Sequence, residues 1–224
     1  MKEILDYFLR LSQNNNKPWF DAHKAEYLHV KEKFEALAEE FILGVAQFDP
    51  RCRNLQVKDC VYRIYRDTRF STDKRPYKDW HGIYVCPRGK NSGMAGYYLH
   101  FEPAADRYLL GAGLYCPTKE VLKSVREQIM LEPDEFHSAV QACGEDFHID
   151  WSTALKRFPV GYNPDDKHSE YYRLKSYDVC LDLTEQDVLQ PDYLPRALEQ
   201  LQKCHPFNEL LNRCVEYAQE GNAR

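Results

Sequence analysis

The spacing of apolar residues changes along the chain and predicts helices at both ends with strands between them. Steps of three and four over residues 2–13 predict a short amphipathic helix, which the asparagines at 14–16 end. Pro18 suits the first turn of a second helix. The same spacing then continues for about eight turns, until Gly44 and Asp49 mark the end of that helix.

In the middle of the chain apolar and polar residues alternate instead, in segments rich in β-forming residues. The predicted strands cover residues 61–66, 81–86, 96–101 and 107–114. Short connections between consecutive strands are typical of an antiparallel meander, with one face packed and the other partly exposed to water. Residues 177–183 alternate in the same way and are a candidate fifth strand.

Helical spacing returns after the meander, with proline at the expected helix starts. Pro117 and Pro133 each open a predicted helix, residues 145–176 are irregular, and Pro206 divides the terminal helical region at 191–219. The fold class is therefore α+β, an antiparallel β-meander of four to five strands flanked by N-terminal and C-terminal helices. We expect one α+β domain over residues 1–224, with helices at about 2–48, the sheet at about 60–116, and helices and irregular chain at about 117–219.

The net charge of −5 conceals a strong local asymmetry. Residues 51–90 hold 11 Lys and Arg against four Asp, a balance of +7, whereas the other 184 residues hold 19 basic and 31 acidic side chains, a balance of −12. A basic segment in an acidic protein favours local anion binding, since a nucleic-acid-binding domain is usually basic throughout.

Cysteine usage and the N-terminal sequence indicate the compartment. The eight cysteines form no CxxC pair, and no export signal or long apolar run is present. We therefore expect buried free thiols, a cytoplasmic location and no membrane association. No complete dinucleotide loop, phosphate loop or zinc motif is present either, so the sequence assigns no cofactor and no metal.

The first candidate site is a basic and aromatic segment around residues 62–81. Arginine binds carboxylate or phosphate with two parallel hydrogen bonds, lysine adds a point charge, and tyrosine supplies a wall and a hydroxyl. The candidate ligand-binding residues are Arg63, Tyr65, Arg66, Arg69, Lys74, Tyr77, Lys78 and Tyr97. In the alternative interpretation, Asp67 and Asp73 pair with the bases of this segment and simply hold the loop in place.

The second candidate site lies on the predicted strand at 96–101. Tyr98, His100 and Glu102 share one face because side chains two apart point the same way. His100 and Glu102 are the candidate catalytic residues, as an acid–base pair. If the neighbouring strand brings His81 to them, the three side chains could hold a divalent metal. The alternative is a half-buried, hydrogen-bonded histidine beside a solvent-facing glutamate.

The chain resembles the bacterial and fungal domain-of-unknown-function family 2461. The resemblance rests on motifs in order along nearly the whole chain. They are NNNKPWF from Asn14, RIYRDTRFS from Arg63, GYYLHFEP from Gly96, GAGLYCP from Gly111, LKR from Leu155 and LKS from Leu174. The resemblance implies a single-domain fold and no assigned activity, substrate or cofactor.

Three functions follow from these observations. The first is a pocket for a small anionic ligand (a phosphate ester, nucleotide or carboxylate) in which His100 and Glu102 carry out any proton transfer. The second is a single-stranded nucleic-acid binding module, which the acidic remainder of the chain argues against. In it, the aromatic residues that stack on bases would be Tyr62, Tyr65, Tyr77 and Trp80. The third is a structural or protein-interaction domain with an ion-paired basic loop. The sequence leaves open whether the protein is an enzyme, and it does not indicate the oligomeric state.

Overall fold

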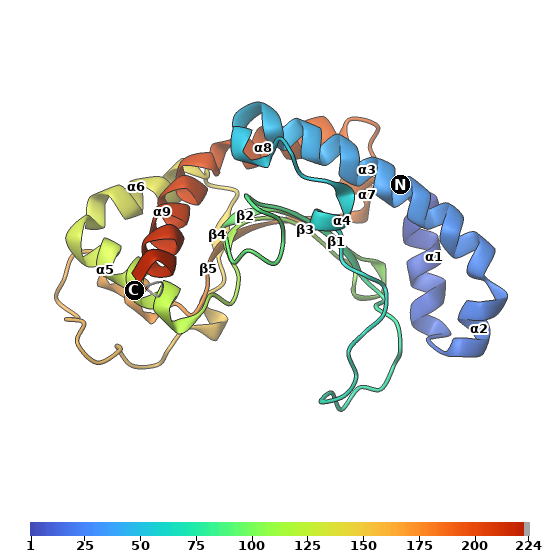
Figure 1. The fold of residues 1–224 in the computed structure, drawn as a ribbon, viewed down its shortest axis with the longest axis horizontal. Coiled ribbons are helices and arrows are strands. Elements are labelled where there is room, and N and C mark those ends of the chain that lie inside the picture. The colour runs from blue at the N-terminus through green and yellow to red at the C-terminus, as the bar shows by residue number, and fades with distance from the viewer. Residues whose placement is uncertain (222–224) are drawn as a thin grey trace.

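The computed structural model describes residues 1–221 and shows an arch of helices over a five-stranded sheet (Figure 1). The strands are β1 (His81–Val85), β2 (Gly96–Glu102), β3 (Arg107–Leu114), β4 (His148–Ile149) and β5 (Tyr177–Leu183). All neighbouring strands are antiparallel, in the order β1-β2-β3-β5-β4. The predicted α+β class is confirmed.

Helices precede and follow the sheet in the chain, as the apolar spacing predicts. They are α1 (Lys2–Gln13), α2 (Lys17–Ala22), α3 (Lys24–Phe48), α4 (Val57–Cys60), α5 (Lys119–Leu131), α6 (Pro133–Ala142), α7 (Glu185–Val188), α8 (Tyr193–Lys203) and α9 (His205–Gly221). No helix within residues 1–221 has the length and apolar character needed to cross a membrane.

Two sequence predictions about local structure are wrong. The predicted long helix after Pro18 is two helices, because the backbone of His23 leaves the helical region and its N–H closes α2 on Trp19 and Phe20. The predicted strand at 61–66 is an extended segment that makes only isolated bridges, Val61 with Ile83 and Tyr65 with Tyr77.

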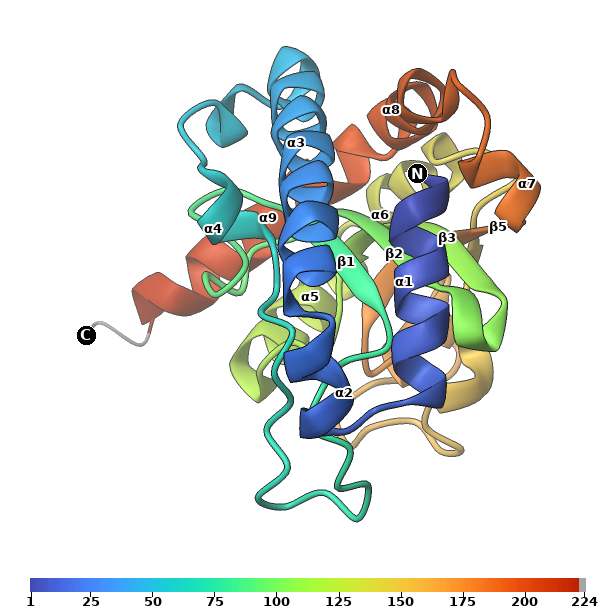
Figure 2. The ribbon, with the colours of Figure 1, turned by 90° about the vertical axis from the view of Figure 1, so that its right-hand side faces the viewer.

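The helices cover one face of the sheet. Figure 2 shows α1 and α3 side by side over β1 and β2, while α8 and α9 contact β3. On β2 the alternate side chains Tyr97, Leu99 and Phe101 point to this face and are at most 1% exposed. The core therefore lies between the helices and this face, and the opposite, concave face of the sheet is left without helices over it (Figure 1).

The start of β2 is anchored to α9 by two buried asparagines one helical turn apart. The side-chain oxygen of Asn212 accepts from the N–H of Ala95 (2.7 Å), and its amide donates to the Ala95 carbonyl (3.1 Å). The amide of Asn208 donates to the carbonyl of Gly96 (3.0 Å). Since the chain just before β2 borders the concave face, these bonds also fix one rim of that face.

Candidate functional site

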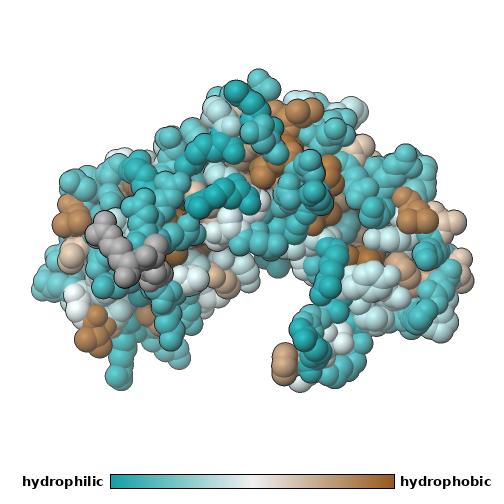
Figure 3. All heavy atoms as spheres, in the orientation of Figure 1, coloured by the Kyte–Doolittle hydropathy of each residue, from teal (hydrophilic) through white to brown (hydrophobic). Residues whose placement is uncertain are grey.

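A cavity of about 940 Å³ lies on the concave face of the sheet. In Figure 3 the molecular surface is hollowed beneath the sheet, between the two ends of the arch. Its walls are rich in aromatic side chains: Tyr62, Trp80, Tyr84, Tyr98 and Tyr115. A concave site with aromatic walls and a few polar groups is the usual form of a small-molecule site.

Strand alternation determines which side chains reach the cavity. In the register of the sheet Tyr98 pairs with Gly111, His100 with Leu109, and Glu102 with Arg107. Residues directly opposite each other in a sheet point to the same face, so these six positions form the cavity floor. Gly111, which has no side chain, keeps the floor low beside Tyr98.

Three side chains of β2 form a continuous hydrogen-bonded chain along the floor. The Tyr98 hydroxyl lies 2.9 Å from Nδ1 of His100, and Nε2 of His100 lies 3.2 Å from Oε2 of Glu102. The His100 side chain is 9% exposed and that of Glu102 is 24% exposed. The sequence prediction that these side chains share a face is confirmed.

The carboxylate of Glu102 determines the state of the imidazole. A carboxylate only accepts hydrogen bonds, so Nε2 of neutral His100 carries the proton and Nδ1 accepts from the Tyr98 hydroxyl. Burial lowers the pKa of His100, and Glu102 counteracts this by favouring the charged ring. Burial raises the pKa of Tyr98, so its hydroxyl keeps its proton. The arrangement therefore holds a neutral imidazole between a phenol that donates to it and a carboxylate that accepts from it.

Gly82 makes room for this chain of hydrogen bonds. A Cβ atom at Gly82 would lie 2.3 Å from the Tyr98 hydroxyl oxygen, so no larger residue fits without moving the ring. We expect Gly82→Ala to break the bond between Tyr98 and His100 and to lower the free energy of unfolding by about 1–3 kcal/mol. NMR of the His100 ring nitrogens measures the first effect, and chemical denaturation measures the second.

Gly111 provides the matched control for this substitution. It pairs with Tyr98 from the other side, but its Cβ atom would meet the nearest Tyr98 atom at 3.5 Å, an ordinary contact. Gly111→Ala should therefore leave the ring-nitrogen signals of His100 unchanged. Identical His100 signals in wild type and Gly82→Ala would contradict the proposed packing.

Neither Arg107, at the cavity floor, nor Lys78, beside its aromatic wall, forms an ion pair with a carboxylate among residues 1–221. Arg107 lies on the cavity floor, and its charge acts on the pKa values of Tyr98, His100 and Tyr115. Nζ of Lys78 lies 5.0 Å from the ring centre of Tyr62 and 4.7 Å from that of Trp80, two of the cavity walls. Burial lowers the pKa of Lys78. Both charges are available to an anion.

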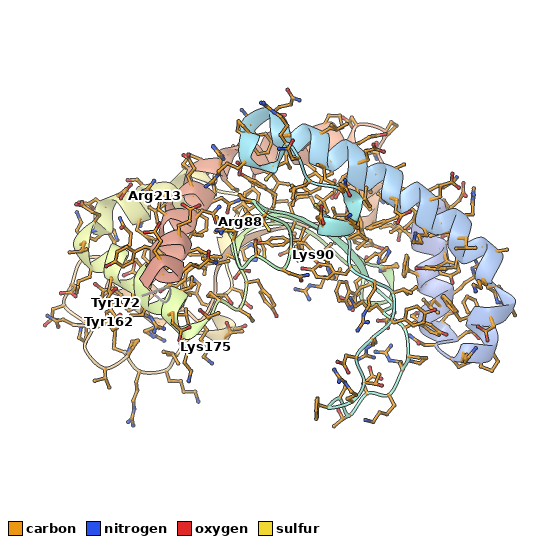
Figure 4. The ribbon with its side chains drawn as sticks, viewed as in Figure 1. Arg88, Lys90, Tyr162, Tyr172, Lys175 and Arg213 are labelled. Atoms are coloured by element: carbon orange, nitrogen blue, oxygen red, sulfur yellow. The ribbon has the colours of Figure 1, made fainter. Side chains whose placement is uncertain are left out.

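Lys90, labelled in Figure 4, also lines the cavity, on the concave side of the sheet. Its ammonium group donates to the backbone carbonyl of Lys58. This bond holds the Lys90 side chain against α4, so it is less free to turn toward a ligand than Arg107.

The central part of the basic segment, between Tyr62 and Trp80, does not line this cavity and is largely ion-paired within itself. Between Tyr65 and Tyr77 the chain forms a loop that extends away from the sheet (Figure 1). The guanidinium of Arg66 pairs with Asp73, and that of Arg69 binds both carboxylate oxygens of Asp67 (2.9 and 2.6 Å). These pairs agree with the alternative interpretation, in which Asp67 and Asp73 hold the loop in place.

The other residues predicted to bind the ligand lie apart from one another. Nζ of Lys74 donates to the Thr68 carbonyl (2.9 Å), and Arg63 and Tyr65 are exposed. The ring of Tyr77 is buried against Phe20, with ring centres 4.0 Å apart.

Tyr97 points to the helix side of the sheet, opposite to the cavity. Its hydroxyl donates to Asp49 (3.3 Å) and lies 2.9 Å from Nδ1 of His205. Of the residues predicted for the two sites, His100 and Glu102 line the cavity, and Lys78 contacts its aromatic wall.

The prediction that His81 meets His100 and Glu102 is wrong. His81 pairs with Phe101 in the register of the sheet, whereas Gly82 pairs with His100, so the two histidines lie on opposite faces. The ring of His81 packs between Phe8 (4.6 Å between ring centres) and Phe34 (4.2 Å). No group of three metal-ligating side chains occurs within residues 1–221.

Sequence reasoning missed Arg107 and Asp178, which also line the cavity. The signal for Arg107 was present, since only four residues separate it from Glu102 and a hairpin that tight places the two opposite each other. Asp178 lies on β5, more than 60 residues along the chain from Arg107, and no local pattern indicates which strand β5 joins.

Fold and site together define an α+β protein that carries a polar, aromatic-walled cavity on the open face of an antiparallel sheet. The family model described as "Conserved hypothetical protein (DUF2461)" matches residues 3–210, so the chain belongs to this family. Neither the search of curated proteins nor the search of solved structures found a match.

Proposed function

We propose that the cavity on the concave face binds a small anionic ligand such as a phosphate ester, nucleotide or carboxylate. The observation that carries the proposal is the position of Arg107, a cation on the cavity floor with no ion-pair partner among residues 1–221. Lys78 adds a second charge at the aromatic wall, and Tyr62 and Trp80 offer faces to a flat ring of the ligand.

Proton transfer within this cavity would fall to His100 and Glu102. A ligand on the floor beside Arg107 contacts Glu102, which lies directly opposite Arg107 on the neighbouring strand. His100 lies two residues before Glu102, on the same face of β2. The Tyr98 hydroxyl completes the chain of hydrogen bonds and keeps its proton near neutral pH. This arrangement supports acid–base chemistry on a bound ligand.

The two other functions have less support. Tyr77 is stacked on Phe20 and cannot stack on a base, which weakens the case for single-stranded nucleic acid. A purely structural role agrees with the ion pairs of the basic loop, but it gives no reason for a cavity whose arginine forms no ion pair among residues 1–221. The described cysteines are free thiols, which favours a reducing compartment, and we propose the cytoplasm.

An anion panel measured with two arginine variants tests the proposal. We expect Arg107→Gln to weaken binding of the best anion at least about tenfold, because the ligand loses its charge-assisted hydrogen bonds. Arg69→Gln, on the ion-paired loop, should leave affinity within about twofold. Thermal shift gives a first screen and calorimetry the affinities. Unchanged binding by Arg107→Gln, or equal loss in both variants, would rule out this cavity as the anion site.

A further inference from the structure

Glu102 and Arg107 bring opposite charges together at one end of the cavity. Glu102 ends β2 and Arg107 begins β3, and the register of the sheet places them directly opposite each other. Residues paired in this way have Cβ atoms about 4.5–5.5 Å apart, and both of these side chains line the cavity. A ligand bound by the guanidinium of Arg107 therefore lies next to the carboxylate of Glu102.

One oxygen of the Glu102 carboxylate is held in place and the other is free. Oε2 lies 3.2 Å from Nε2 of His100, whereas Oε1 makes no hydrogen bond within residues 1–221. The Glu102 side chain is 24% exposed, so a ligand in the cavity can reach it. A fixed carboxylate with one free oxygen is suited to remove a proton from a ligand.

Both nitrogens of the His100 ring already take part in hydrogen bonds. Nδ1 lies 2.9 Å from the Tyr98 hydroxyl, and Nε2 donates to Glu102. The ring also packs beside Trp80, with ring centres 5.6 Å apart, and its side chain is only 9% exposed. His100 therefore orients the carboxylate of Glu102 and is a positioning residue, because it has no free nitrogen for the ligand.

The hydrogen-bond donors at this end of the cavity indicate the class of ligand. The Tyr98 hydroxyl donates to His100 and the His100 N–H to Glu102, so negative charge that forms beside Glu102 must be stabilised by Arg107. A carbon gives up a proton readily when an adjacent carbonyl oxygen takes up the charge. In a 2-oxo acid the carboxylate and this carbonyl oxygen are neighbours, so the donors of one guanidinium can bind both.

We propose that the cavity binds a 2-oxo acid at Arg107 and that Glu102 removes a proton from its C3 carbon. This inference rests on the proposed function, because the same arginine binds the anion. The C3–H bond breaks, the proton goes to Oε1 of Glu102, and its electron pair forms a double bond between C2 and C3. The π electrons of the carbonyl group move to the oxygen, and the enolate formed is the conjugate base of the ligand. Return of the proton from Glu102 to C3 reverses the step, so no further reactant is needed.

The neighbours of this pair indicate which side chain the acid carries. Leu109 lines the cavity two residues after Arg107, on the same face of β3 and directly opposite His100. Trp80 lies on the other side, beside the His100 ring. An apolar or aromatic group on C3 can contact both, so we expect phenylpyruvate to bind more tightly than pyruvate.

Deuterium exchange in heavy water, followed by proton NMR at neutral pH, tests the proposal. A proton that Glu102 removes is replaced by a deuteron from the solvent, so the C3–H signal of the ligand disappears. The probes are pyruvate, 2-oxobutyrate and phenylpyruvate. With wild type we expect at least one probe to exchange at least about a hundredfold faster than in buffer, the lower end of what a positioned base provides.

Two glutamate variants identify the base. Glu102→Gln keeps the size of the side chain and an oxygen that accepts from His100, so it should still bind the probe but exchange it at the buffer rate. Glu120→Gln is the control and should keep the wild-type rate, because Glu120 lines the same cavity from the first turn of α5. Circular dichroism confirms folding. If Glu102→Gln does not fold, Glu102→Asp takes its place, and the withdrawn carboxylate should slow exchange at least about tenfold.

Two histidine variants distinguish a positioning residue from a base. The amide of His100→Gln can still donate to Glu102, whereas the side chain of His100→Leu cannot. We expect the glutamine variant to keep more of the maximal exchange rate than the leucine variant. The probe concentration that gives half of the maximal rate should stay close to that of wild type in the glutamine variant. If both variants lose exchange equally while Glu102→Gln retains it, His100 is the base and the proposal is wrong.

The outcomes separate this inference from the proposed function. If the 2-oxo acids bind but none exchanges, or if exchange survives in Glu102→Gln, the role of Glu102 is refuted and the anion site stands. If other anions bind but no 2-oxo acid does, the ligand class is refuted. If neither these probes nor any member of the wider anion panel binds, the proposed function itself fails.

Discussion

Replacing His81 by phenylalanine is expected to make the protein more resistant to acid than the wild type, by roughly 3 kcal/mol of unfolding free energy at pH 4. Burial lowers the pKa of this histidine to about 3, far below its ordinary value of 6.5. In the folded state the ring therefore stays neutral between Phe8 and Phe34. In the unfolded state the same ring takes up a proton below pH 6.5.

The direction of the change in stability with pH depends on whether the folded or the unfolded state binds the proton. Below pH 6.5 the unfolded chain binds a proton at His81 that the folded chain refuses, so the wild type loses stability as pH falls from 6.5 toward 3. Phenylalanine has no such proton equilibrium, and it also removes Nδ1, a buried nitrogen without a hydrogen-bond partner in the described structure. The two proteins should differ little at pH 7.5 and increasingly below pH 6.

Urea denaturation of both proteins between pH 4 and 8 measures this difference. His29→Gln is the control, since His29 lies exposed on α3, with a surface contact to Glu3 (3.2 Å) in place of the buried packing of His81. The difference between His29→Gln and wild type should therefore change far less with pH. A constant difference between His81→Phe and wild type over the whole range would show that His81 does not resist protonation.

His81 also illustrates what strand alternation can and cannot predict. The alternation of β2 correctly places Tyr98, His100 and Glu102 on one face, because that prediction needs only residues within one strand. Placing His81 beside them needs the register between two strands. A shift of one residue reverses the face, and the register found here pairs His81 with the core residue Phe101.

The prediction of a strand at residues 61–66 was wrong for a related physical reason. Its alternation is typical of a strand, but its hydrogen bonds go to its own returning arm: the N–H of Arg66 donates to the Pro76 carbonyl (3.0 Å), and that of Lys78 to the Ile64 carbonyl (2.8 Å). Composition likewise identified an excess of positive charge there, but it could not show which of these bases Asp67 and Asp73 bind. The part of the cavity that β5 supplies was beyond prediction, because β5 joins the sheet from a distant part of the chain.

Replacing Asn212 by leucine is expected to lower the free energy of unfolding by about 3 kcal/mol or more. The substitution keeps the approximate size of the side chain but leaves both the N–H and the carbonyl of Ala95 without a partner inside the protein. Each buried polar group left unpaired costs about 1–3 kcal/mol. Asn212 is fully buried, so water cannot replace the lost bonds without opening the contact between α9 and β2.

The effect should extend to the cavity. Ala95 directly precedes β2 and follows Gly93 and Met94, two residues of the cavity rim. The Tyr84 hydroxyl, from the cavity wall, donates to the carbonyl of Met94 (2.8 Å). We therefore expect Asn212→Leu to weaken ligand binding even at temperatures where the protein remains folded. Thermal denaturation with and without the best anion measures both effects.

Substitutions at two further positions on α9 are expected to lower the free energy of unfolding less than Asn212→Leu does. Asn208→Leu removes one donor, to Gly96, and also an amide oxygen that has no partner in the described structure, so we expect a loss of about 1 kcal/mol. Gln219→Leu removes an exposed bond to the Ser92 carbonyl (3.2 Å) and should change stability by less than about 0.5 kcal/mol. If Asn212→Leu proved no more destabilising than Asn208→Leu, the pair of bonds to Ala95 would not be what anchors the start of β2 to α9.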